Sequence, residues 1–139
     1  MTLRQTLGAL CVAASISAPA HAAIFATVVG IDDYAYQSDL DGAVNDARDL
    51  SAALRQRGAD VQLLLDREAT RSAIVRSIRS QMSKARRGDV VVFTFAGHGI
   101  QVPEALAGDE RDGKDENFVF YAFERTGEGA GERLRDNDI

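Results

Sequence analysis

The sequence predicts an α/β fold with a mostly parallel sheet, and three features of the chain point to it. Two apolar, β-rich runs occupy residues 24–31 and 90–95, and a shorter run occupies residues 61–65. Two segments with helical periodicity separate these runs. Because strand–helix–strand connections are almost always right-handed, this order gives a parallel sheet with helices on both faces.

The first 22 residues have the features of a secretory signal peptide. Arg4 supplies a positive start, residues 7–16 form an apolar stretch too short to span a bilayer, and Ala20-His21-Ala22 is a small-x-small cleavage site. We therefore expect a secreted or periplasmic protein whose folded domain comprises residues 23–139. The alternative for this segment is a buried first helix.

Charge and hydropathy argue against nucleic acid and a membrane span, and the cysteine content argues against disulfides. The formal net charge is −5 and there is no basic stripe, so nucleic acid is a poor candidate. No segment after the signal is long and apolar enough to span a membrane. The only cysteine, Cys11, lies in the signal, so residues 23–139 contain neither a disulfide nor a thiol.

The three strands differ in what surrounds them. Residues 24–31 form the first strand, with the carboxylates of Asp32 and Asp33 at its carboxyl end. Residues 61–65 form a short strand closed by another aspartate. Residues 90–95 show no strict alternation of apolar and polar side chains, so we expect both faces to be covered, as in the middle of a parallel sheet.

Each predicted helix has one apolar stripe and recognisable ends. The stripe of the first helix is Leu40, Val44, Ala47, Leu50 and Leu54, and that of the second is Ile74, Ile78, Met82 and Ala85. Asp39 and Asp41 suit the N-cap of the first helix, and Thr70 caps the second. Gly58 and Gly88 end the two helices.

His98 is the leading candidate for chemistry. It follows the strand of residues 90–95 between Gly97 and Gly99, at the carboxyl end where open α/β sheets place their ligands. Histidine has a pKa near neutrality, which suits a general base, and the N–H of Gly99 could stabilise an oxyanion. The alternative is a turn histidine without chemistry, and no serine lies in a G-x-S-x-G pattern to serve as a nucleophile.

The chain changes character after Gly99. Residues 101–117 are strongly acidic, residues 118–123 are expected to form one arm of a hairpin beside the main sheet, and three glycines mark a following turn. The acidic loop does not match the EF-hand pattern, because a glycine would occupy the first ligand position.

Three blocks of sequence, in this order and spacing, resemble the caspase-type cysteine peptidases, and most closely the bacterial caspase-like proteins and metacaspases. They are Val-Val-Gly-Ile-Asp-Asp-Tyr (residues 28–34), Leu-Asp-Gly-Ala-Val-Asn-Asp-Ala (40–47) and Phe-Thr-Phe-Ala-Gly-His-Gly-Ile-Gln (93–101). The resemblance covers nearly all of residues 24–139. It implies a three-layer αβα sandwich and the cleavage of a polypeptide substrate.

The resemblance also implies roles for individual residues. His98 matches the catalytic histidine, and Gly99 matches the donor to the oxyanion. Asp46 matches an acid that lines a pocket for basic side chains, which implies cleavage after arginine or lysine. We place Asp32 with Asp46 in the substrate-binding set. For both carboxylates, capping a helix or interacting with its dipole is the alternative.

No cofactor is required by this chemistry, but the resemblance to calcium-activated metacaspases implies a calcium site. The acids equivalent to its ligands are Asp115, Asp136 and Asp138. The alternative for this acidic region is a solvated surface loop.

The chain departs from the family pattern in one respect, since no cysteine follows the signal. In this family the histidine precedes the nucleophilic cysteine by about 50 residues, and only 41 residues follow His98 (139 − 98). We therefore expect the amino-terminal part of a catalytic domain, incomplete at its C-terminal side and inactive alone.

Three arrangements remain open. A C-terminal segment could complete the sheet of a peptidase. Alternatively, the chain is a caspase-like pseudoprotease or regulatory binding module whose sheet a partner completes. The third alternative is a doubly wound domain for a small ligand, although no glycine-rich phosphate loop is present.

Overall fold

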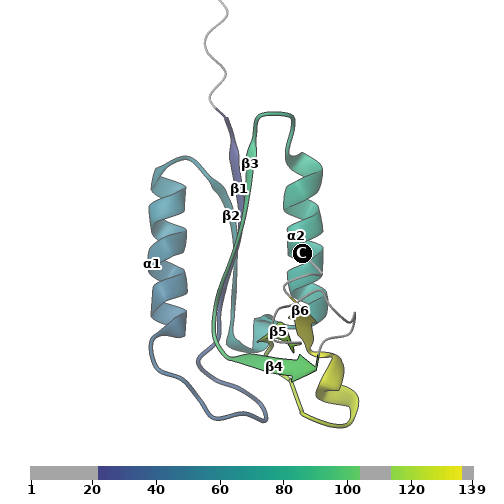
Figure 1. Ribbon diagram of the computed structural model, residues 1–139. Coiled ribbons are helices and arrows are strands. Elements are labelled where there is room, and N and C mark those ends of the chain that lie inside the picture. Colours follow the sequence, from purple (N-terminus) through teal and green to yellow (C-terminus); the bar gives the residue numbers. More distant parts are fainter. Residues whose placement is uncertain (1–21, 104–113, 136–139) are drawn as a thin grey trace, which may run out of the picture.

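The computed structural model describes residues 22–103 and 114–135. Strands β1 (Ile24–Gly30), β2 (Asp60–Leu65) and β3 (Val90–Ala96) form a parallel sheet in the order β2-β1-β3. Helices α1 (Ala43–Gln56) and α2 (Arg71–Lys84) cover opposite faces of this sheet (Figure 1). The predicted α/β class with a parallel sheet is confirmed.

The central strand of this sheet is β1, and β3 lies at its edge. Residues 26–30 of β1 are buried, whereas Val90 and Val91 at the start of β3 are 47% and 42% exposed. Among the described strands, β3 pairs only with β1. The prediction that both faces of residues 90–95 are covered is confirmed only in part, because helices cover both faces of the sheet (Figure 1) but Val90 and Val91 at the start of β3 are exposed.

The helix starts use caps that were only partly predicted. Thr70 caps α2 as expected, since its Oγ1 accepts a hydrogen bond from the N–H of Ala73 at 3.3 Å. The predicted N-caps of α1 are wrong, because Gly42 occupies that position with a φ of 110°. The carboxylate of Asp39 instead accepts a hydrogen bond from the N–H of Tyr34 at 3.1 Å.

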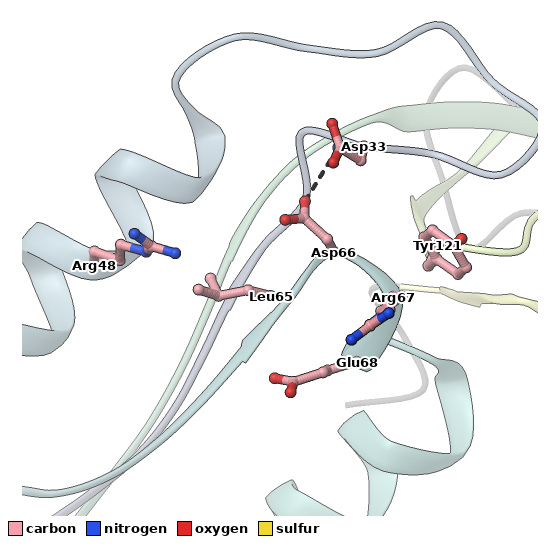
Figure 2. A pocket seen from close by; sticks show the side chains of 7 residues that line it. All are labelled: Asp33, Arg48, Leu65, Asp66, Arg67, Glu68 and Tyr121. Atoms are coloured by element: carbon pink, nitrogen blue, oxygen red, sulfur yellow. Dashed lines mark hydrogen bonds between the residues drawn. The ribbon is translucent and has the colours of Figure 1, made fainter.

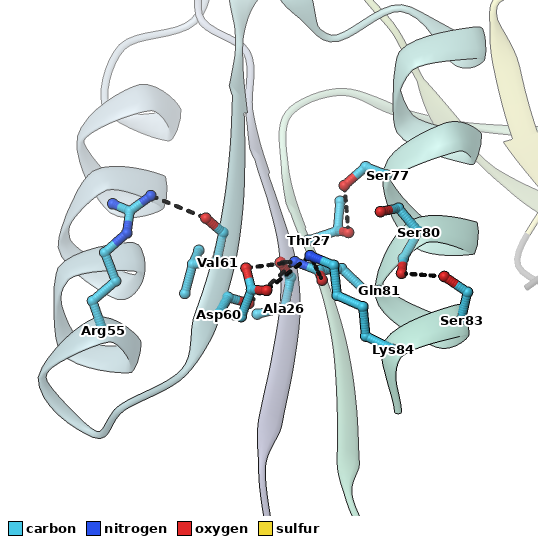
Figure 3. Close-up of polar contacts among 10 residues, drawn as sticks. All are labelled: Ala26, Thr27, Arg55, Asp60, Val61, Ser77, Ser80, Gln81, Ser83 and Lys84. Atoms are coloured by element: carbon cyan, nitrogen blue, oxygen red, sulfur yellow. Dashed lines mark hydrogen bonds and ion pairs between the residues drawn. The ribbon is translucent and has the colours of Figure 1, made fainter. Parts of the chain in front are cut away.

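Polar side chains replace two of the predicted apolar positions under the helices. Leu50 and Met82 are 40% and 59% exposed, and Ser51 and Gln81 are buried instead. The burial of Gln81 has a physical reason, because strand carbonyls that are buried require donors. Its Nε2 donates to the carbonyl oxygen of Ala26 at 3.0 Å and to that of the first residue of β2 at 3.1 Å (Figure 3).

A second sheet follows the histidine. Strands β4 (Gly99–Pro103), β5 (Lys114–Val119) and β6 (Arg133–Arg135) form an antiparallel sheet in the order β4-β5-β6. The predicted strand of residues 118–123 is wrong in its bounds, since pairing begins at Lys114 and ends at Val119. Two short 3₁₀ helices complete the described elements, η1 (Asp66–Glu68) and η2 (Glu128–Gly131).

Aromatic packing joins the two sheets into one core. The ring of Phe118 from β5 lies 5.8 Å from that of Phe93 and 5.1 Å from that of Phe95, both from β3. Such pairs stabilise a core beyond the area that they bury. The second sheet is therefore fixed against the α2 face of the first, in contact with the strand that leads to His98.

Some predictions fall outside the described residues. The signal peptide does so except for its last residue, and so do residues 104–113 of the acidic loop and the last four residues. In the part of the chain that the structure describes, no helix has the length and hydrophobicity of a membrane span.

Candidate active site

His98 lies at the carboxyl rim of the parallel sheet. Strands β1 and β3 run in the same direction, with Gly30 opposite Ala96, so their carboxyl ends meet at one edge. The N–H of Ile31 donates to the carbonyl of Ala96 at 3.0 Å and extends this pairing by one residue. His98 follows two residues later, at the position where such sheets place ligands.

The imidazole of His98 is oriented by a main-chain carbonyl. Its Nε2 lies 2.7 Å from the carbonyl oxygen of Ser38, in the loop between β1 and α1. A carbonyl oxygen can only accept, so Nε2 carries the proton of this hydrogen bond. In the neutral ring Nδ1 is then the unprotonated nitrogen, which is the form that a general base requires.

The main chain of His98 is held by Tyr34. The N–H of His98 donates to the Tyr34 hydroxyl at 2.7 Å, and the two ring centroids are 4.8 Å apart. The hydroxyl donates in turn to the carbonyl of Val119 at 3.3 Å. Burial raises the pKa of Tyr34 to about 12, so the phenol keeps its proton at ordinary pH.

Sequence reasoning missed both contacts for different reasons. Ser38 acts through its main-chain carbonyl, so no side-chain pattern could reveal it. Tyr34 ends the first of the three sequence blocks, and that position was the available signal.

Gly99 lies directly after His98, at the start of β4. It is exposed and lies opposite Phe118. A main-chain N–H beside a general base can stabilise a developing oxyanion. The role of Gly99 stays a prediction.

The Asp32 carboxylate caps the start of α1, although Asp32 lies well before that helix in the sequence. Its two carboxylate oxygens accept hydrogen bonds from the N–H groups of Ala43 and Val44, at 2.8 and 3.2 Å. These donors are among the four that every helix leaves unsatisfied at its start. The predicted substrate-binding role of Asp32 stays a prediction, and the carboxylate already has two partners within the fold.

A second carboxylate holds Asp32 in place. Oδ1 of Asp66, directly after β2, accepts hydrogen bonds from the N–H groups of Asp32 and Asp33 at 2.9 and 3.1 Å. Asp66 has a φ of 44°, a left-handed conformation that aspartate tolerates better than most residues. Asp66 thus links the end of β2 to the end of β1, and Asp32 links the end of β1 to the start of α1.

Asp46 lies in the first turn of α1 and is exposed to solvent. Its carboxylate makes no hydrogen bond or ion pair with a described residue, and no contact with His98 is present in this part of the chain. The role of Asp46 in substrate binding stays a prediction.

A cavity of about 410 Å³ lies beside the carboxyl end of β2 (Figure 2). Its described lining consists of Asp33, Arg48, Leu65, Asp66, Arg67, Glu68 and Tyr121. Neither His98 nor Asp46 is among these residues. The cavity and the candidate base are therefore separate features of the rim.

The comparison with protein families decides the identity of this arrangement. A family model described as the caspase domain matches residues 23–126. The chain belongs to the caspase domain family. The resemblance inferred from the three sequence blocks is therefore confirmed.

Metacaspases are similar to this caspase-domain chain over most of its length. Metacaspase-1 of Pyricularia oryzae is 37% identical over 112 residues, and Metacaspase-1 of Mycosarcoma maydis is 32% identical over 112 residues. These matches cover 73% and 74% of the chain, respectively, but 28% of each relative. The chain thus spans little more than a quarter of the length of these metacaspases.

A solved structure supports the caspase-like fold. The crystal structure of a protein from Geobacter sulfurreducens matches the chain with a TM-score of 0.67 and 26% sequence identity. The match covers 83% of this chain and 42% of that protein. The fold is consistent with a caspase-like sandwich that is incomplete in these residues.

Only one of the three acids of the predicted calcium site, Asp115, lies in the described part of this caspase domain, so the site stays a prediction. Asp115 is buried in β5, and Nη1 of Arg135 lies 3.8 Å from its carboxylate. Within residues 22–103 and 114–135, no three side chains of the kinds that bind metals are grouped together. The other two candidate ligands, Asp136 and Asp138, lie outside the described residues.

Proposed function

We propose that this chain is part of a caspase-like cysteine endopeptidase that cleaves polypeptides after arginine or lysine. The observation that carries the proposal is the contact between Nε2 of His98 and the Ser38 carbonyl, which leaves Nδ1 unprotonated at the sheet rim. The family assignment supplies the class of reaction. Since residues 23–139 contain no cysteine, the nucleophile comes from polypeptide other than these residues.

His98 acts as the base in this reaction. Nδ1 takes the proton of the cysteine thiol, and the thiolate attacks the carbonyl carbon of the scissile peptide bond. The N–H of Gly99 stabilises the oxyanion that forms. The tetrahedral species collapses to an acyl-enzyme, and the leaving amine takes the proton from the imidazolium. Water then attacks the thioester with His98 as base, releasing the acid and restoring the thiol.

Asp46 gives the specificity for basic side chains. Its exposed carboxylate near the rim can pair with an arginine or lysine of the substrate. Asp32 contributes by fixing the start of the helix that carries Asp46. No step of this mechanism requires calcium.

The proposed location is secreted or periplasmic. The match to the caspase domain begins at residue 23, directly after the predicted signal peptide, and this position supports the proposal.

The test compares the 139-residue chain with the product of the whole reading frame. We expect the longer protein to hydrolyse a fluorogenic peptide with arginine before the scissile bond, and to lose at least about 100-fold in kcat/KM in His98→Ala. The 139-residue chain is expected to show no cleavage. Cleavage by that chain, or full activity of His98→Ala, would contradict the proposal.

The second candidate is a pseudoprotease or regulatory binding module, favoured by the absence of cysteine from residues 23–139. Reading the gene beyond codon 139 separates the two candidates. A stop codon there supports the binding module, and a further strand that ends in a cysteine supports the peptidase.

A further inference from the structure

We propose that Tyr34 is a positioning residue that holds His98 in the orientation of a general base. The importance of that orientation rests on the proposed peptidase function. The contacts themselves can be measured without any cleavage reaction, so failure of one proposal can be told apart from failure of the other.

The Tyr34 hydroxyl links the histidine to the second sheet. It accepts from the N–H of His98 at 2.7 Å and donates to the carbonyl of Val119 at 3.3 Å. The N–H of Val119 donates to the carbonyl of His98 at 3.0 Å. Both main-chain polar groups of His98 are thus bonded, one to Tyr34 and the other to the residue that Tyr34 contacts.

This link matters because glycines flank the histidine. Gly97 and Gly99 would leave the main chain of His98 free to rotate, since glycine has the largest conformational freedom. A buried hydroxyl bonded to the His98 N–H removes that freedom. The ring of Tyr34 also packs against the imidazole, with an interplanar angle of 48°.

Gly97 is required for the contact to form. A Cβ at this position would lie 2.5 Å from the Tyr34 hydroxyl and 2.7 Å from Cζ of Phe95. Any larger residue would therefore displace the phenol or the phenyl ring. The glycine before the histidine thus makes room for the group that orients it.

One loop supplies both restraints on His98. Tyr34 and Ser38 lie in the loop between β1 and α1, and Asp39 of the same loop accepts a hydrogen bond from the N–H of Tyr34 at 3.1 Å. Tyr34 holds the main chain while the Ser38 carbonyl holds Nε2. Loss of the first contact should therefore weaken the second.

The test is NMR of the whole chain labelled with ¹⁵N-histidine, which contains only His21 and His98. In the unaltered protein we expect a protected Nε2–H resonance and a slowly exchanging amide for His98. In Tyr34→Phe we expect amide exchange at His98 to be at least about tenfold faster and the Nε2–H resonance to be lost to solvent exchange. The matched control is Tyr36→Phe, because Tyr36 is 62% exposed, and it should change neither signal.

Two outcomes would overturn the proposal. If Tyr34→Phe speeds amide exchange but leaves the Nε2–H resonance of His98 unchanged, Tyr34 has a structural role only. If the His98 amide of the unaltered protein is unprotected, the hydrogen bond to the Tyr34 hydroxyl does not exist in solution. This second outcome can be observed even if the variants do not fold. Gly97→Ala provides a second variant, and we expect it to reproduce both changes while the hydroxyl is still present.

Discussion

At the scale of single residues, the histidine is oriented by main-chain and phenolic groups. The Ser38 carbonyl fixes the protonated nitrogen, and Tyr34 fixes the main chain. The Ser38 carbonyl is neutral, so this hydrogen bond orients the ring without placing a carboxylate against Nε2. By contrast, the carboxylates of Asp66 and Asp32 hold the end of β1 and the start of α1.

Asp46 should determine the preference for a basic residue before the scissile bond. In the longer protein, Asp46→Asn should lower kcat/KM for a peptide with arginine before the scissile bond by about tenfold or more, because a charge-assisted hydrogen bond becomes a neutral one. A peptide with a neutral residue at that position should be affected much less. Asp49→Asn is the matched control on the same exposed helix surface. Equal losses for both peptides would contradict the assignment.

Asp32 should stabilise the protein by capping the start of α1. Asp32→Ala should lower the free energy of unfolding by about 0.5–2 kcal/mol, because the N–H groups of Ala43 and Val44 lose their acceptors. Urea denaturation followed by circular dichroism measures this change. Asp33→Ala is the control, since the Asp33 carboxylate makes no hydrogen bond with a described residue. An unchanged midpoint for Asp32→Ala would show that the cap is unimportant.

At the scale of elements, α2 is attached to the sheet by hydrogen bonds as well as by apolar packing. The hydroxyls of Thr27 and Ser77 are hydrogen-bonded at 2.7 Å, and Gln81 donates to two strand carbonyls (Figure 3). These bonds fix the position of α2 along the strands, because each donor can reach its acceptor only in one position. Apolar contacts alone would tolerate a small displacement.

We predict that Gln81→Leu destabilises the protein by about 1–3 kcal/mol although the new side chain is apolar. The reason is that the buried carbonyl of Ala26 loses a donor that leucine cannot replace. Denaturant unfolding measures the change. Met82→Leu, at an exposed neighbouring position, should stay within about 0.5 kcal/mol. A stabilised Gln81→Leu would mean that the polar contacts carry no net energy.

At the scale of the whole molecule, the site lies where two sheets join. One core contains Val29 and Ile74 from the first sheet and its helix, and Phe120 and Leu134 from the segment of the second sheet. His98 is part of the short connection between β3 and β4, so anything that separates the sheets also disturbs the histidine. Stability and the geometry of the site are therefore coupled.

Two carboxylates should make the stability of the fold depend on pH in acid. The pKa of Asp60 is lowered, mainly by its hydrogen bond from Lys84 at 2.8 Å, and the pKa of Asp89 is lowered by main-chain N–H groups of Arg86 and Ala23. A carboxyl whose folded-state pKa is depressed stabilises the fold above its unfolded value, near 3.8. That stabilisation is lost as the pH falls through the folded-state pKa.

We therefore predict that the free energy of unfolding decreases as the pH falls below about 4. The double variant Asp60→Asn, Asp89→Asn should be less stable at pH 7 and should lose less on acidification. Urea denaturation at a series of pH values measures both effects, with Asp49→Asn as the control. Parallel pH profiles for the double variant and the unaltered protein would contradict the assignment.

The sequence alone determined the α/β class, the parallel order of the first strands, the family and the place of His98 at a strand end. These properties depend on the local pattern of apolar residues, glycines and caps, which a linear sequence displays. It did not determine that β1 is the central strand, that Gln81 is buried in place of Met82, or that Asp32 caps α1. Nor could it show that Tyr34 and the Ser38 carbonyl hold the histidine. Each of these depends on groups that are distant in sequence and often belong to the main chain, so only the tertiary structure brings them together.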